Sequence, residues 1–232
     1  MGAGAMRWCL TYLATLGLSA PVLAQDLTLT AVGNEPFWRA DIANDLLTLQ
    51  RLGMENLTLP LVALEGAEAI SVILAADADE EQRVALTVAD VLCHDSMSGM
   101  PFPAAASVTT GDTILVGCAG DPLDLLTGTQ WQVDAMPGVE LSAEAPPRFQ
   151  FEPTGQITGR GGCNRFFAPF ELTGEALIFG PVGATRLACP GGIAEQEAGF
   201  FAALEQVDGF DISDTGLLIL RSASDALIVA RR

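Results

Sequence analysis

Apolar and polar residues alternate in short runs along the first half of the chain. The run 27–32, LTLTAV, has an apolar side chain at every second position, as a half-buried strand should. Turn residues separate such runs, for example Ala43-Asn44-Asp45, where Asn and Asp tolerate a positive φ. Strands are predicted at 27–32, 37–42, 46–52, 70–75, 84–93 and 113–118. Several short strands and no convincing helix predict a small antiparallel β-barrel or sandwich.

Two segments between these runs are predicted not to be strands. The acidic segment 77–82 is expected to form a hairpin tip or a short helical turn. The segment 98–106 contains Pro101 and Pro103 and is predicted to be a loop that covers one end of the first domain.

The composition changes at Ala119-Gly120-Asp121-Pro122, and a different pattern begins at Leu125. Strands are predicted at 129–135, 148–151, 156–160, 166–172, 176–179, 217–221 and 227–231. One helix is predicted at 193–207, with a core-facing stripe of Ile193, Ala194, Ala198, Phe201, Leu204 and Val207. The polar residues expected mostly outside are Glu195, Gln196, Glu197, Glu205 and Gln206. The second half therefore predicts an α+β domain in which one helix caps an antiparallel sheet.

The first 24 residues have the pattern of a secretory signal peptide. Arg7 precedes an apolar core at 8–18, and the small-residue exit Val22-Leu23-Ala24 predicts cleavage after Ala24. No later run reaches the roughly 18 apolar residues that a membrane-spanning helix needs. Cys9 lies inside the apolar core and not at the cleavage point, so a lipid anchor is not expected. The predicted organisation is a signal peptide at 1–24 and domains at 25–121 and 122–232, in the periplasm.

The charge of the chain is strongly acidic. Eleven arginines and no lysine face 29 acidic residues, for a net charge of −18, which becomes −19 once the signal peptide is removed. Nucleic acids and anionic membrane surfaces are not expected as partners, because binding them depends on basic residues that displace counterions. The acidity favours solubility, the alternative being an acidic docking face for a basic ligand.

Four cysteines remain after removal of the signal peptide: Cys93, Cys118, Cys163 and Cys189. An even number in an exported chain predicts disulfides, and three pairings are formally open. The predicted domain boundary allows only Cys93 with Cys118 and Cys163 with Cys189. Neither a CxxC motif nor a metal-ligand spacing occurs, so no metal or other cofactor is expected.

Few residues are candidates for chemistry or binding. His94 stands beside Cys93, Asp95 and Ser96, but adjacent strand residues point to opposite faces and are poorly placed as a relay. The glycine-rich run at 159–162 lacks the lysine of a phosphate-binding loop and is better explained by positive φ or close backbone approach.

Four residues are candidates for ligand or partner contact. Arg160, Asn164 and Arg165 cluster at the glycine-rich turn, where the alternative role for Asn164 is to cap neighbouring backbone groups. Trp38, next to Phe37, is a candidate either for a barrel plug or for the wall of a ligand cavity.

The second half resembles the META domain family, which includes the HslJ-like heat-shock proteins. The resemblance covers about 125–232 and rests on LLTGTQWQV, GRGGCNRFFAPFEL, RLACPGG and the segment GIAEQEAGFFAAL, in that order. It implies an envelope or secreted protein tied to stress or drug tolerance, without an established enzymatic activity. The first half resembles an uncharacterised bacterial envelope domain, which implies a Cys93–Cys118 bridge.

Three functions are therefore considered. The first is an exported, non-enzymatic envelope protein that binds a partner protein or a small amphipathic ligand during stress. The second is a lipocalin-like carrier whose Phe37 and Trp38 line a cavity, and the third is a hydrolase that uses His94 and Ser96.

Overall fold

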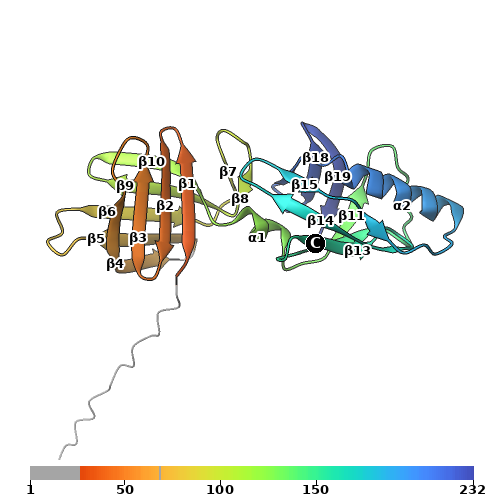
Figure 1. Cartoon of the computed structure of the whole chain (residues 1–232), viewed down its shortest axis with the longest axis horizontal. Coiled ribbons are helices and arrows are strands. Elements are labelled where there is room, and N and C mark those ends of the chain that lie inside the picture. Colours follow the sequence, from red (N-terminus) through yellow and green to blue (C-terminus); the bar gives the residue numbers. More distant parts are fainter. Residues whose placement is uncertain (1–26, 68) are drawn as a thin grey trace, which may run out of the picture.

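The computed structural model describes residues 27–67 and 69–232, so the predicted signal peptide lies outside the described residues. Two β-rich bodies lie side by side along the long axis of the molecule (Figure 1). The first is a closed antiparallel barrel and the second a curved antiparallel sheet with a helix along one side. The fold class predicted from the sequence is confirmed, and the choice between barrel and sandwich falls on the barrel.

The barrel has eight strands in the order β1-β10-β9-β6-β5-β4-β3-β2. Every second side chain of a strand points into the barrel and fills its interior. On β2 these are Trp38, Ala40 and Ile42, which are at most 2% exposed. The strands are β1 (Leu29–Asn34), β2 (Phe37–Ala43), β3 (Leu46–Arg51), β4 (Leu57–Ala67), β5 (Ile70–Ala76), β6 (Arg83–Ala89), β9 (Ala104–Thr110) and β10 (Thr113–Ala119).

Two of the barrel strands are absent from the sequence prediction. Strand β4 contains Pro60, a residue that normally argues against a strand interior, and β9 begins with three alanines of weak β propensity. Strand β9 also occupies part of the segment predicted to be a loop at 98–106. Barrel closure overrides both local signals, because β4 pairs with β3 and β5 while β9 pairs with β6 and β10.

A small hairpin connects the two bodies. Its strands are β7 (Cys93–His94) and β8 (Pro101–Phe102), and the Cys93–Cys118 disulfide ties it to β10. Met100, in the hairpin loop, is 1% exposed and belongs to the hydrophobic core of the second body. The His94 Nε2 atom lies 2.8 Å from Asp211 Oδ1. The hairpin therefore belongs to the first half in sequence but completes the core of the second.

The second body is a sheet in the order β15-β14-β13-β12-β11-β19-β18-β17, with β16 also paired to β14. Its two ends meet where the Leu177 N–H donates to the Asp208 carbonyl at 3.2 Å. The strands are β11 (Trp131–Ala135), β12 (Arg148–Glu152), β13 (Gln156–Arg160), β14 (Arg165–Leu172), β15 (Leu177–Phe179), β16 (Gly183–Ala184), β17 (Gly209–Ile212), β18 (Leu218–Ser222) and β19 (Asp225–Arg231).

Two helices accompany this sheet, α1 (Pro122–Leu126) and α2 (Gly191–Leu204). The predicted helix is present, but its core-facing stripe is wrong in the first half. Ala194 and Ala198 are exposed, whereas Gln196, Glu197 and Phe200 are buried. The physical reason is that Gln196 and Glu197 hydrogen-bond to loop backbone under the helix, so polar contacts and not hydrophobicity set this face. Neither described helix is long and apolar enough to cross a membrane.

Candidate functional site

Three arginines lie next to one another on adjacent strands at one end of the second sheet. In the strand register Arg148 of β12 is opposite Arg160 of β13, and Arg160 is opposite Arg165 of β14. Residues directly opposite on neighbouring strands project from the same face, with Cβ atoms about 5 Å apart. Arg186 follows Thr185, whose N–H donates to the Arg165 carbonyl at 3.0 Å, so the backbone of this segment lies beside β14. We call Arg148, Arg160 and Arg165 the arginine face.

The arginine face rests on a closely packed core. Phe149, Ile157 and Phe166 lie on the opposite side of the same three strands and are at most 4% exposed. The Phe166 ring contacts Phe200 of α2 edge-on, with centroids 5.4 Å apart. Packing of this kind fixes the strands, so the arginine spacing is set before any ligand arrives.

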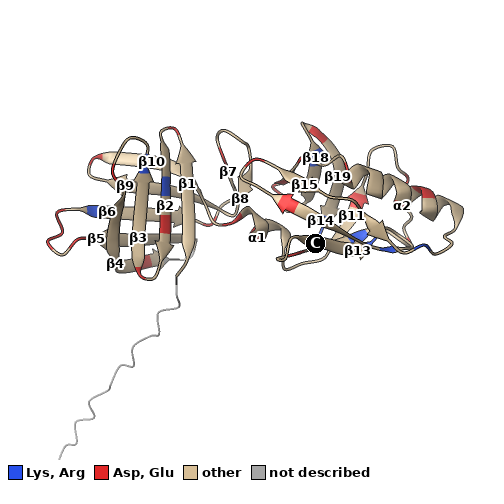
Figure 2. Ribbon diagram, in the orientation of Figure 1, with Lys and Arg blue, Asp and Glu red and all other residues tan. Residues whose placement is uncertain are grey.

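The arginine face carries uncompensated positive charge. Three of the eleven arginines gather here in a chain of net charge −18, and Figure 2 shows blue ribbon at this end of β13. Over residues 27–67 and 69–232, the ion pairs within 4.0 Å involve Arg39, Arg83, His94 and Arg231 and none of these three. The polar contact recorded for Arg148 is to the Gln132 amide, at 3.0 Å. Like charges directly opposite on a sheet repel, so the arrangement favours an added anion.

The glycine-rich turn brings α2 close to the end of β13. A Cβ at Gly161 would lie 2.7 Å from Glu197 Cγ and 2.9 Å from Phe201 Cζ, and Gly162 has φ +135°. Both positions therefore require glycine, as the sequence predicts for this run. The predicted Cys163–Cys189 disulfide is formed, with Cα atoms 6.0 Å apart, and joins the turn to the segment before α2.

Asn164 is a structural residue beneath the arginine face. It is 6% exposed, and its Oδ1 accepts hydrogen bonds from Thr185 Oγ1 at 2.8 Å and Leu187 N–H at 2.7 Å. Its Nδ2 donates to Glu197 Oε1 at 2.6 Å and to Cys189 Sγ at 3.3 Å. Because its donors and acceptors are engaged inside the protein, the capping role weighed in the sequence describes it better than ligand contact.

Glu197 is the central residue of this scaffold, although the sequence predicts it outside. It is 7% exposed, and its Oε2 accepts from the backbone N–H groups of Cys163 at 3.2 Å and Asn164 at 2.6 Å. The carboxylate thus holds the turn that connects Arg160 of β13 to Arg165 of β14. No pattern of apolar residues reveals this role, since it depends on loop backbone donors.

Trp38 lies in the barrel and not at the arginine face. It is 0% exposed in the barrel core, and its Nε1 donates to the Val116 carbonyl at 3.1 Å. Phe37 is 44% exposed on the outside of the barrel. The two rings therefore lie on opposite sides of the wall, which is the plug arrangement and not the lipocalin-like one.

His94 is engaged between the two bodies. Its imidazole Nε2 lies 2.8 Å from Asp211 Oδ1 of β17, which fixes the ring between the barrel and the second sheet. The described residues include no group of three or more His, Cys, Asp or Glu side chains that could hold a metal ion. The hydrolase hypothesis with His94 and Ser96 stays a prediction.

Comparison with known proteins identifies the second body. The META domain family matches residues 124–232, so the C-terminal half of this chain is a META domain. An NMR structure of a protein from Burkholderia xenovorans is 27% identical, with a TM-score of 0.40, covering 47% of this chain and 84% of that chain. A comparison with curated proteins gave no significant match.

Proposed function

We propose that this is an exported, non-enzymatic envelope protein whose META domain binds an acidic segment of a partner protein through the arginine face. The observation that carries the proposal is the row Arg148, Arg160 and Arg165 on adjacent strands without an acidic partner among residues 27–67 and 69–232. Guanidinium groups bind carboxylates bidentately and remain protonated at neutral pH. Such groups suit recognition and do not serve as proton donors or acceptors in catalysis.

A protein partner is favoured over a free anion by the neighbouring surface. Phe167 lies two residues after Arg165 on the same face of β14, and its side chain is 56% exposed. Aromatic residues and arginine are enriched at protein interfaces, where an aromatic ring supplies buried apolar area.

A short acidic segment is favoured over a long polyanion. The net charge of −18 repels extended anionic polymers and surfaces. At physiological ionic strength charges act over about 8 Å, so a short segment would experience mainly the local arginines.

The exported location is part of the proposal. The two disulfides support an oxidising compartment, and the signal-like residues 1–24 support export to the periplasm. Mass spectrometry of the protein recovered from a periplasmic fraction should give Gln25 as the first residue. An uncleaved chain retained in the cytoplasm would contradict this part of the proposal.

The binding surface is tested by removing two of its charges. For the double variant Arg160→Gln/Arg165→Gln we expect about tenfold weaker binding of a short fluorescein-labelled peptide, hexa-L-glutamate, at low salt, because two charge-assisted contacts are lost. The measurement is fluorescence anisotropy at two salt concentrations, and the effect should shrink at high salt.

The matched control removes the same charge elsewhere. Arg51→Gln/Arg83→Gln on the barrel strands β3 and β6 changes the net charge equally but leaves the arginine face intact. Equal weakening by both double variants would mean that only net charge matters and would reject the proposed surface.

A further inference from the structure

A groove lies between the barrel and the META domain. Its walls are the outer faces of β1 and β2, the β7–β8 hairpin, the start of α1 and the turn between β14 and β15. The groove has a volume of about 800 Å³. Sites for small molecules are typically about 300–1,000 Å³ and often lie between domains.

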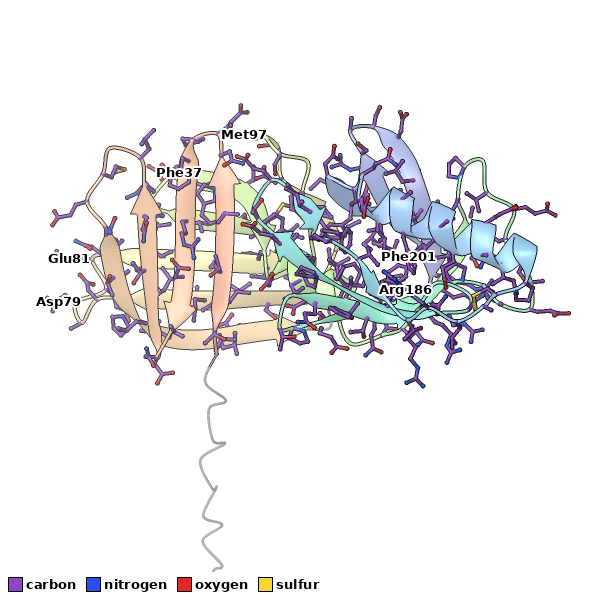
Figure 3. All side chains as sticks on the ribbon, turned by 45° about the vertical axis from the view of Figure 1, so that its right-hand side comes forward. Phe37, Asp79, Glu81, Met97, Arg186 and Phe201 are labelled. Carbon is purple, nitrogen blue, oxygen red and sulfur yellow. A yellow bond between two sulfur atoms is a disulfide. The ribbon has the colours of Figure 1, made fainter. Side chains whose placement is uncertain are left out.

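The lining of the groove includes an apolar surface. Figure 3 shows Phe37 and Met97 at the same end of the barrel, with their side chains on its outside. Phe37 is 44% and Met97 75% exposed, and an unbranched Met side chain adapts its shape to different ligands. The apolar lining residues are Val32, Phe37, Met97, Phe102, Leu123 and Leu172.

The charge that remains in the groove is negative. Arg39 is the basic residue of the lining, and its guanidinium is already paired with Asp41 through Nε at 2.7 Å and Nη2 at 2.8 Å. Three acidic residues also line the groove: Asp95, Asp121 and Glu175. An apolar surface flanked by carboxylates complements a ligand with an apolar body and a cationic head.

One of these carboxylates is held in place. Asp95 Oδ1 accepts from the Ser98 N–H and hydroxyl, each at 2.8 Å, and from the Met97 N–H at 3.1 Å. Its Oδ2 accepts from the Asn34 side-chain amide on β1. Asp95 thus fastens the hairpin that carries Met97 to the barrel wall, which keeps the groove formed without a ligand.

We infer that the groove between the barrel and the META domain binds a small amphipathic cation, with Phe37 and Met97 against its apolar body and Glu175 near its charged head. This site is separate from the arginine face, from which it differs in charge. The small amphipathic ligand considered from the sequence would then bind on the outside of the barrel and not in its interior.

Isothermal titration calorimetry with dodecyltrimethylammonium, below its micelle concentration, tests the inference. We expect one molecule to bind per chain, and dodecyl sulfate of the same chain length to bind at least about tenfold more weakly because its charge is repelled. Tetramethylammonium, which lacks the apolar body, should give no measurable heat. Equal binding of the two detergents would overturn the inference.

Two substitutions locate the site. Phe37→Ser and Glu175→Gln should each weaken binding, the first by about tenfold through loss of apolar contact. Matched controls are Ile114→Ser, a 67% exposed barrel residue, and Glu171→Gln on β14, both outside the groove lining. Circular dichroism is used to check that each variant folds. If Phe37→Ser does not fold, the affinity of Glu175→Gln alone tests the location of the site.

Unchanged affinity in folded groove variants would overturn the inference, as would equal loss in the controls. These outcomes do not bear on the arginine face, because hexa-L-glutamate binding is measured separately with different variants.

Discussion

At the scale of single residues, the buried Glu197 carboxylate organises the turn below the arginine face. It accepts hydrogen bonds from the backbone of Cys163 and Asn164 and from the Asn164 side chain. A buried carboxylate is costly unless such donors compensate for lost hydration. Glu197 therefore links α2 to the strands that carry Arg160 and Arg165.

Replacing Glu197 by alanine should destabilise the META domain. Glu197→Ala leaves two backbone N–H groups and one amide without their acceptor, at a cost of about 3 kcal/mol. Alanine is a good helix former, so the loss would not come from helix propensity. The measurement is the free energy of unfolding in urea, with disulfides intact.

Glu195→Ala is the matched control, since Glu195 is exposed on the same helix. Its effect should stay within about 0.5 kcal/mol. Equal stability of the two variants would show that the hydrogen bonds of Glu197 contribute little.

The residue scale is also where prediction from sequence is weakest. Glu197 is predicted outside because acidic residues are almost never buried unless paired, and its donors come from a loop 33 residues earlier. Arg148, by contrast, could have been found. The turn at 152–155 fixes the β12–β13 register, which places Arg148 opposite Arg160.

At the scale of elements, the β7–β8 hairpin depends on the ionised form of Asp95. Burial raises the pKa of Asp95, but the hydrogen bonds from Ser98, Met97 and Asn34 together lower it below its ordinary value. A carboxyl whose pKa is lower in the folded state stabilises the fold above its ordinary pKa. That stability is lost as the pH falls through the folded-state pKa.

Removing one hydrogen-bond donor to Asp95 should shift the loss of fold stability to higher pH. In Asn34→Ala the pKa of Asp95 should rise toward its ordinary value, because one hydrogen bond to the charged form is gone. The measurement is a carbon-13 NMR titration of the Asp95 carboxyl group between neutral and acid pH. Asn56→Ala, at an exposed loop position, is the control. A pKa unchanged by Asn34→Ala would contradict the role given to this hydrogen bond.

Elements with clear alternation or clear turns are predictable from the sequence. The predicted 156–160 coincides with β13, and the predicted 166–172 differs from β14 by one residue. The segment 84–93 is predicted as one strand, but β6 ends at Ala89 and Cys93 belongs to the separate hairpin. Its position depends on Met100 packing into the other domain, a contact that no local pattern encodes.

At the scale of the whole molecule, charge is distributed unevenly over a strongly acidic chain. The acidic turn with Asp79 and Glu81 lies at the far end of the barrel, whereas Arg186 lies on the META domain (Figure 3). Net charge alone predicts no anionic partner, yet strand register concentrates arginines on one face. The proposed function follows from this local concentration.

The most direct measurement of this claim follows the arginine side chains themselves. Nitrogen-15-labelled protein is titrated with hexa-L-glutamate, and the Nε–Hε signals of the arginines are recorded by NMR. We predict that the signals of Arg148, Arg160 and Arg165 shift together while those of Arg51 and Arg83 stay in place. Shifts confined to the barrel arginines, or no shifts at the highest hexa-L-glutamate concentration, would contradict the proposed function.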